Sequence, residues 1–262
     1  MRANPTLKNL LVFLNIILEN IMNLILDIGN TNSKYSVFES GRIKSFGVWD
    51  SSEVKEEFQN WNNNNQNCES IIVSDVIGTN KSYFESVTRC PLVWVSAKIK
   101  LPYKINYKIP EELGADRIGL VAAAVFAYPK KNCLVIDIGT CITYDFVSKN
   151  SVYLGGSISP GFSMRYNSIS TNTSSLPELK ITIPKKIMAD STETCIHSGI
   201  YYGIYAEIEN QINFYKKKYK DLTIILTGGD SKYFVNRIKN VIFANHNFIS
   251  KGLFNILKLN NS

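Results

Sequence analysis

A short sequence pattern occurs twice in this chain, and this internal repeat constrains the fold more than any other feature. Leu24–Thr31 is an apolar run that ends in Asp-Ile-Gly-Asn-Thr, and Leu134–Thr140 repeats the run with the ending Asp-Ile-Gly-Thr. After each glycine the chain is again rich in aromatic and β-branched residues, over Lys34–Phe38 and Ile142–Val147, as is typical of a returning strand. The repeat therefore predicts two related β-hairpins in two similar halves.

Helix and strand patterns alternate around both hairpins. Apolar periodicity predicts helices over Ser51–Trp61, Leu113–Tyr128, Thr192–Tyr219 and Tyr233–Lys239. Short apolar runs predict further strands over Ser70–Ser74, Leu92–Ser96 and Leu222–Leu226. Such alternation indicates an α/β fold. Because the periodicity breaks around Pro129, we expect a first half over residues 22–129 and a second half over residues 130–262.

The first 21 residues differ from this pattern. Leu10–Leu18 is an apolar run behind Arg2 and Lys8, but it is too short to span a bilayer and no small-residue cleavage site follows it. We expect residues 1–21 to be an extension that the fold does not need, such as the product of an upstream start codon. An amphipathic surface helix is the alternative.

Composition argues against several classes of protein. The net charge is +7, yet the basic residues are scattered, and the densest cluster, Lys216–Lys220, ends a predicted helix, where cations complement the helix dipole. No aromatic-basic signature accompanies the charge, so we expect neither a nucleic-acid partner nor a membrane partner. The five cysteines form no C-x-x-C pair, which favours a reducing cytoplasm. His197 and His246 are too far apart in sequence to form the usual helical metal-binding pair.

The two hairpin turns carry the chemistry of a phosphate site. Asp27 with Gly29, and Asp137 with Gly139, each combine a carboxylate, a close-approach glycine and neighbouring N–H and O–H donors. One such turn would also fit an ordinary hairpin. Two turns that face one another across a cleft would bind the phosphates of ATP and hold Mg²⁺, which predicts a phosphotransferase. Thr227–Asp230 follows a predicted strand, and its glycines would let the backbone lie against a nucleotide base or ribose.

Together these motifs resemble the actin-like ATPase superfamily, which includes sugar kinases, and within it the type III pantothenate kinases. The most specific likeness is Tyr107–Arg117, in which a tyrosine is followed seven residues later by G-A-D-R. Leu154–Phe162 resembles the family's G-G-x-I-x-P-G loop, which leads into a helix with Met164 and Arg165. The resemblance covers nearly all of the chain from Met22 onward. It implies a duplicated ribonuclease H-like fold whose two halves flank a nucleotide cleft.

The resemblance also implies an activity: ATP-dependent phosphorylation of pantothenate to 4'-phosphopantothenate, the first step of coenzyme A biosynthesis. It implies a homodimer with the substrate site at the subunit interface, and a monovalent cation, K⁺ or NH₄⁺, bound by Asp137. The implied ATP-binding residues are Asp27, Ile28, Gly29, Asn30, Thr31, Asn32, Ser33, Lys34, Thr140, Thr227, Gly228 and Gly229. The implied substrate-binding residues are Tyr107, Gly114, Ala115, Asp116, Arg117 and Thr192, with Asp116 as the catalytic proton acceptor.

Each of these roles has a structural alternative. A guanidinium such as Arg117 suits the pantothenate carboxylate, and Asp116 could accept the hydroxyl proton, but an Asp-Arg pair also simply caps a helix. Asp137 could stabilise its own turn. Ser191 could be an N-cap, with Thr192 merely in the first helical turn. Ser191, Cys195 and Cys141 depart from the family pattern, which puts fine substrate contacts in doubt.

Two rival functions remain open from the sequence. One is an actin-like kinase for another small hydroxyl compound, because the hairpins report phosphate handling and say little about the acceptor. The G-A-D-R segment discriminates against it. The other is a non-catalytic nucleotide-binding regulator on the same fold. The intact carboxylates of Asp27, Asp116 and Asp137 argue against that reading.

Overall fold

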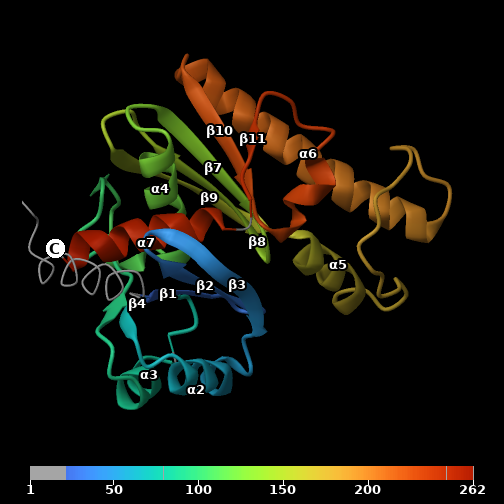
Figure 1. Cartoon of the computed structure of the whole chain (residues 1–262). Helices are drawn as coiled ribbons and strands as arrows, with labels where there is room; N and C mark the ends of the chain where they lie inside the picture. Colours follow the sequence, from blue (N-terminus) through green and yellow to red (C-terminus); the bar gives the residue numbers. More distant parts are fainter. Residues whose placement is uncertain (1–21, 79, 246, 262) are drawn as a thin grey trace, which may run out of the picture. The chain divides into compact units, whose positions relative to one another are not determined.

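A computed structural model describes residues 22–78, 80–245 and 247–261 of the chain (Figure 1). The extension predicted at residues 1–21 lies outside the described residues. The described residues form two compact units, one drawn from 22–101, 111–119 and 249–261, the other from 102–110 and 120–248. The C-terminal segment thus belongs to the first unit, and the boundary expected at residues 129 and 130 remains a prediction.

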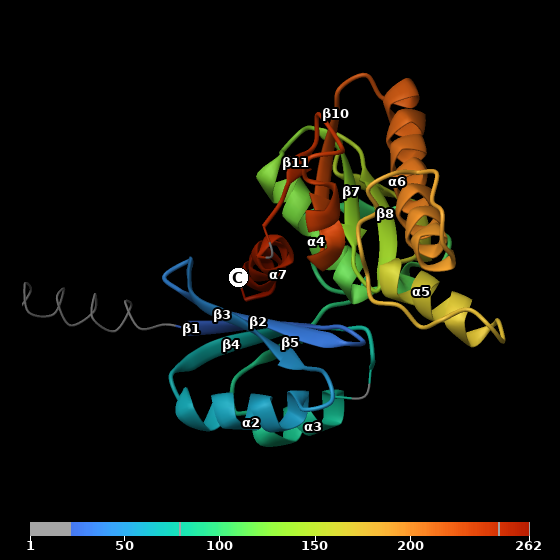
Figure 2. The same cartoon turned by 90° about the vertical axis from the view of Figure 1, so that its right-hand side faces the viewer.

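The first unit is built on a five-stranded sheet of order β3-β2-β1-β4-β5. Its strands are β1 (Met22–Ile28), β2 (Asn32–Glu39), β3 (Arg42–Asp50), β4 (Cys68–Asp75) and β5 (Leu92–Trp94). Helices α2 (Val54–Asn64) and α3 (Lys81–Val87) cover one face of this sheet (Figure 2). Leu24, Leu26 and Ile28 alternate along β1 toward that face, and Phe58 stacks on Phe84 at 4.0 Å in the same core. Because successive side chains of a strand point to opposite faces, the intervening residues, including Asp27, lie on the opposite face.

One helix of the first unit, α7 (Phe248–Asn260), lies on that opposite face. The turn η1 (Pro110–Glu112) precedes α4 (Ala115–Ala127), whose first residues belong to this unit, and α7 ends the chain. Phe38 of β2 stacks on Phe254 of α7 at 4.2 Å, and Ser36 donates a 2.9 Å hydrogen bond to Ser250. These contacts cover the far end of the face, so that Asp27 lies toward its other end.

The second unit contains a six-stranded sheet of order β11-β10-β7-β8-β9-β6. Its strands are β6 (Lys104–Ile105), β7 (Asn132–Ile138), β8 (Cys141–Val147), β9 (Val152–Pro160), β10 (Leu222–Thr227) and β11 (Ile242–Phe243). Helices α5 (Phe162–Thr171) and α6 (Thr192–Lys218) pack on one face, against a core that includes Leu134, Ile136 and Ile200. The other face carries Asp137.

The two sheets share a central arrangement. In the first, β1 is antiparallel to β2 and parallel to β4; in the second, β7 is antiparallel to β8 and parallel to β10. Each central strand ends in the Asp-Ile-Gly turn of the internal repeat. The predicted hairpins and the duplicated α/β fold are therefore confirmed.

Two predicted elements are wrong. Leu154–Phe162 is not a loop, because its first seven residues lie in β9, where Gly156 pairs with Asp145 of β8 and has no room for a side chain. Tyr233–Lys239 is not a helix. The 3₁₀ turn η2 (Gly229–Phe234) replaces it, and Phe234 and Ile238 are buried at helical spacing without a continuous helix between them.

Candidate active site

The first hairpin turn places a carboxylate among polar neighbours on one sheet face. Asp27, at the end of β1, pairs in register with Lys34 of β2 and with Ser74 of β4. Residues directly opposite one another on adjacent strands share a face, so the three side chains form a row across the sheet. The hydroxyl of Ser74 donates a 3.0 Å hydrogen bond to Asp27 Oδ1. An ammonium group and a carboxylate thus lie together at the strand ends.

The electrostatics of this row favour an added cation. The pKa of the Asp27 carboxyl is raised to about 6, chiefly by burial and also by the nearby Asp116, while Lys34 and the Ser74 hydroxyl act to lower it. Two carboxyl groups of the first unit, from β1 and from the first turn of α4, are therefore close enough to repel one another. A Mg²⁺ ion would relieve this repulsion, and oxygen ligands of this kind suit it.

The backbone of the first turn is held from one side. Ser51, just after β3, donates from its hydroxyl to the carbonyl of Gly29 at 2.7 Å and lies 2.8 Å from the Ser33 hydroxyl. Asn30, Thr31 and Asn32 remain exposed at the tip of the turn. These residues are therefore accessible to a phosphate. The sequence did not predict a role for Ser51, because only the folded structure brings it next to Gly29 and Ser33.

The G-A-D-R segment opens α4, as predicted. Asp116 lies in the first turn, and its Oδ1 accepts a 2.8 Å hydrogen bond from the backbone N–H of Arg117. A side chain at Gly114 would approach Asp116 Oδ1 to 2.6 Å, so glycine leaves the carboxylate its space. Arg117 is only 5% exposed. The segment therefore has a helix-start role in the folded chain, in addition to any role toward a substrate.

The second hairpin turn repeats the row of the first. Asp137, at the end of β7, pairs in register with Thr143 of β8 and with Thr227 of β10. Thr143, Asp137 and Thr227 thus take the places that Lys34, Asp27 and Ser74 hold in the first unit. The hydroxyl oxygen of Thr143 is buried, and no hydrogen-bond partner for it lies among the residues that the structure describes. A carboxylate beside threonine hydroxyls is an oxygen-rich donor set, which suits a hard monovalent cation.

Two glycines press against this second turn and explain two of the glycine motifs. Gly228 has a φ of +92°, and a side chain there would collide with Ile138 and with the Asp137 carboxylate. Gly161 donates from its N–H to the carbonyl of Thr140 at 3.1 Å, and a side chain there would lie 2.6 Å from that oxygen. Thr140 itself is exposed. Any larger residue at either glycine would push the turn away.

The remaining predicted substrate residues lie in the second unit. The Tyr107 ring lies 6.0 Å from the ring of Tyr153 and is half-buried. Thr192 is exposed in the first turn of α6. Ser191 is the N-cap of that helix, where its hydroxyl accepts from the N–H of Thr194 at 3.3 Å in a capping box. The capping role of Ser191 is confirmed, and the substrate role of Thr192 stays a prediction.

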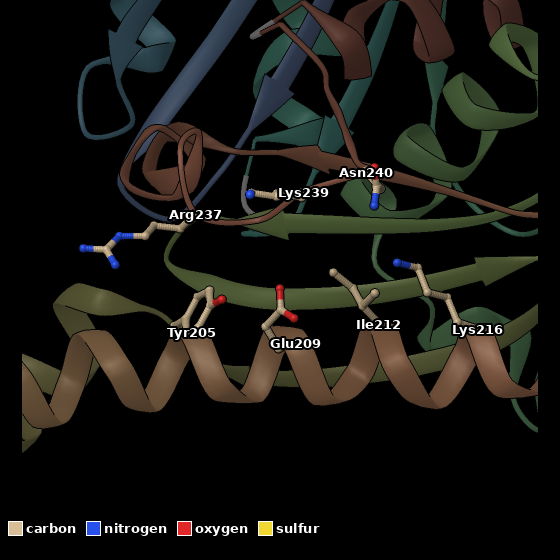
Figure 3. Close-up of a pocket in the computed structure, with 7 residues that line it drawn as sticks. All are labelled: Tyr205, Glu209, Ile212, Lys216, Arg237, Lys239 and Asn240. Carbon is tan, nitrogen blue, oxygen red and sulfur yellow. The ribbon is translucent and has the colours of Figure 1, made fainter. Parts of the chain in front are cut away.

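The second unit also contains a hollow of about 300 Å³, away from its acidic glycine turn (Figure 3). It is lined by Tyr205, Glu209, Ile212, Lys216, Arg237, Lys239 and Asn240. The hollow borders α6, which covers the sheet face opposite to Asp137. Its cationic lining is therefore separate from the phosphate turn of the same unit.

The two sheets share one central topology, and the central strand of each ends in an acidic glycine turn, which defines a duplicated actin-like fold. Solved structures agree. A proposed Baf-family transcriptional activator from Campylobacter jejuni matches with a TM-score of 0.63 and 23% identity, covering 91% of this chain and 98% of its own. Lmo2764, a proposed N-acetylmannosamine kinase from Listeria monocytogenes, matches with a TM-score of 0.52 and 14% identity, covering 90% of this chain and 99% of its own.

Sequence comparison gives the particular family. The family model for type III pantothenate kinase matches residues 23–213. The type III pantothenate kinase of Christiangramia forsetii is 42% identical over 91% of this chain and 99% of its own length. That of Flavobacterium psychrophilum is 39% identical over 90% and 98%. The chain belongs to the type III pantothenate kinase family.

Proposed function

We propose that this protein is an ATP-dependent kinase that phosphorylates the primary hydroxyl of pantothenate, the first step of coenzyme A biosynthesis. Family membership supports the substrate. The observation that carries the mechanism is that Asp116 lies near enough to Asp27 in the first unit to raise its pKa, because this brings a proton acceptor close to a phosphate turn. Phosphoryl transfer needs little more from a protein than positioning and charge stabilisation.

The two acidic turns bind the phosphates of ATP. Asn30 and Thr31 offer exposed donors in the first turn, Lys34 adds a positive charge, and Thr140 offers an exposed hydroxyl in the second. The backbone at Gly228 and Gly229 contacts the adenosine, as glycines allow close approach. The other ATP-binding residues that we propose are Asp27, Ile28, Gly29, Asn32 and Ser33 of the first turn, and Thr227.

The acceptor hydroxyl binds beside Asp116. Asp116 takes the hydroxyl proton as the oxygen forms its bond to the γ-phosphorus, and the bond from that phosphorus to the bridging oxygen breaks to release ADP. Arg117 pairs with the pantothenate carboxylate, and Tyr107, Thr192, Gly114 and Ala115 shape the surrounding site. The loose transition state means that Asp116 contributes only part of the acceleration.

Two cations complete the site. The repulsion between Asp27 and Asp116 fits a divalent ion at the first turn, and Mg²⁺ bound with ATP neutralises phosphate charge. Asp137, with the buried hydroxyl of Thr143, fits a monovalent cation, K⁺ or NH₄⁺. No group of three or more His, Cys, Asp and Glu side chains within the described residues is placed to hold a metal ion.

Assembly and compartment follow from the same proposal. We propose a homodimer in which the partner subunit contributes to the pantothenate site, as the family resemblance implies. In the described ranges no helix is both long and apolar enough to cross a bilayer. ATP as substrate and five free cysteines favour the cytoplasm as the place of action.

A coupled ADP-release assay with Mg-ATP and K⁺ tests this function. Turnover should depend on pantothenate, and Asp116→Asn should lower it by at least about 100-fold, in line with the usual contribution of a general base. A folded, ATP-binding preparation without pantothenate-dependent turnover would reject the substrate. Turnover unchanged by Asp116→Asn would keep the enzyme and remove Asp116 from the chemistry.

A further inference from the structure

Three elements of the second unit meet at one carboxylate of α6, Glu207. Tyr144 of β8 donates to Glu207 Oε1 at 2.8 Å, and Ser159 of β9 donates to the same oxygen. Arg165 of α5 donates from Nη2 to Oε2 and forms an ion pair with it. The side chains of Arg165 and Glu207 are 23% and 26% exposed, so water screens this network less than it screens a surface ion pair.

The charge on Glu207 is maintained by these donors. Burial acts to raise the pKa of Glu207, but hydrogen bonds from Ser159, Arg165 and Tyr144 together hold it below the ordinary value. The carboxylate is therefore ionised at neutral pH. Gly203, one turn earlier in α6, lies beside the guanidinium, since a Cβ there would be in ordinary van der Waals contact with Arg165 at 3.8 Å.

Arg165 links this carboxylate to the second phosphate turn. Its Nε donates to the carbonyl of Pro160 at 2.8 Å. The next residue, Gly161, donates to the carbonyl of Thr140 at 3.1 Å and packs too closely for any side chain. Every link from Glu207 to the turn is thus a hydrogen bond, an ion pair or a covalent bond, and the corner between β9 and α5 cannot shift without moving the turn.

We propose that Glu207 and Arg165 are positioning residues for the second phosphate turn. The pair holds the corner at Pro160 and Gly161, and this corner fixes the exposed Thr140 where it meets the nucleotide. Only the nucleotide-binding consequence rests on the proposed function, because the link to the turn is a property of the folded chain. Supporting contacts of this kind decide how well a binding turn is organised before the ligand arrives.

Hydrogen exchange and steady-state kinetics of three variants test this proposal. Glu207→Gln removes the charge, Arg165→Lys keeps the charge but cannot form both hydrogen bonds, and Glu209→Gln is the matched control on the same helix. The amides of Gly139 and Gly161 are reporters, because both donate hydrogen bonds at the turn. Amides of β10 serve as the internal reference for intact folding.

In Glu207→Gln and Arg165→Lys we expect both reporter amides to exchange at least about tenfold faster, with β10 unchanged. KM for Mg-ATP should rise about tenfold and KM for pantothenate should stay within about twofold, whereas Glu209→Gln should match the native chain. Unchanged exchange at the turn, or faster exchange there in Glu209→Gln as well, would overturn the proposal. A native chain without pantothenate-dependent turnover would reject the proposed function alone, and the exchange data would still decide the positioning role.

Discussion

Replacing Asp27 by asparagine should make the free protein more stable at neutral pH. The folded-state pKa of Asp27 is raised from 3.8 to about 6, chiefly by burial and then by Asp116, against the opposing pull of Lys34 and Ser74. Between about pH 4 and pH 6, the folded state therefore holds a proton that the unfolded state has already released. The stabilising contribution of that proton is complete below the unfolded pKa near 4 and is lost as the pH rises through about 6.

The pKa shift sets the size of the expected gain in stability. A shift of about two pKa units corresponds to roughly 3 kcal/mol at pH 8, and because Asp27 is partly exposed we expect about 1–2 kcal/mol. Asp27→Asn keeps the shape and can still accept from Ser74, so it removes this penalty. Its melting temperature at pH 8 should exceed that of the native chain by about 3–6 °C. The difference should shrink as the pH falls below about 6 and should vanish below about 4.

Thermal unfolding from pH 4 to 8 without nucleotide measures this. Asp50→Asn is the control of opposite sign, because hydrogen bonds from Ser52 hold the pKa of Asp50 below its ordinary value, so that substitution should not stabilise the protein. The same Asp27→Asn variant should lose most of its ATP-dependent turnover. A variant less stable than the native chain at pH 8, or a stability gap independent of pH, would refute the reasoning.

Three further predictions follow from the site. Gly161→Ala should raise KM for Mg-ATP and lower the melting temperature, whereas Gly199→Ala, in open space on α6, should stabilise the protein by about 0.5–1 kcal/mol. If both substitutions changed the melting temperature equally, the close packing of Gly161 against the second turn would be contradicted. Ser191→Ala should lower the free energy of unfolding by about 1 kcal/mol and leave KM for pantothenate unchanged, whereas Thr192→Ala should raise that KM with little loss of stability. The reverse pattern would assign the substrate contact to Ser191 instead of Thr192. Replacing K⁺ by Na⁺ should lower native turnover but leave Asp137→Asn, already slow, unaffected; a K⁺ response retained in the variant would place the cation elsewhere.

The parts of the fold that sequence predicts are those coded by local pattern. The repeated Asp-Ile-Gly turns, the strands around Asp27 and Asp137, and the long helix from Thr192 depend on neighbours in the chain, so periodicity and turn chemistry suffice. Packing partners distant in sequence are not coded this way. The link from Ser36 to Ser250 joins residues 214 positions apart, and α7, which carries Ser250, was not predicted although its apolar spacing was visible.

Glycine caused one of the two wrong element predictions. In Leu154–Phe162 glycine and proline indicate a loop. Gly156 is instead needed because a Cβ there would collide with the backbone of the neighbouring strand β8. The same residue type thus marks a flexible turn or a tightly packed strand, and only the neighbouring strand distinguishes them. The supporting roles of Ser51 and Glu207 were invisible for a related reason, since each acts on a turn through contacts far along the chain.

Product analysis by mass spectrometry tests the central claim most directly. The native chain would be incubated with Mg-ATP, K⁺ and an equimolar mixture of pantothenate and N-acetylmannosamine, with Asp116→Asn as the matched control. The proposed function predicts that pantothenate alone gains one phosphoryl group and that the product falls at least about 100-fold in the variant. Phosphorylation of the sugar instead, or no phosphorylated acceptor from a preparation that binds ATP, would contradict it.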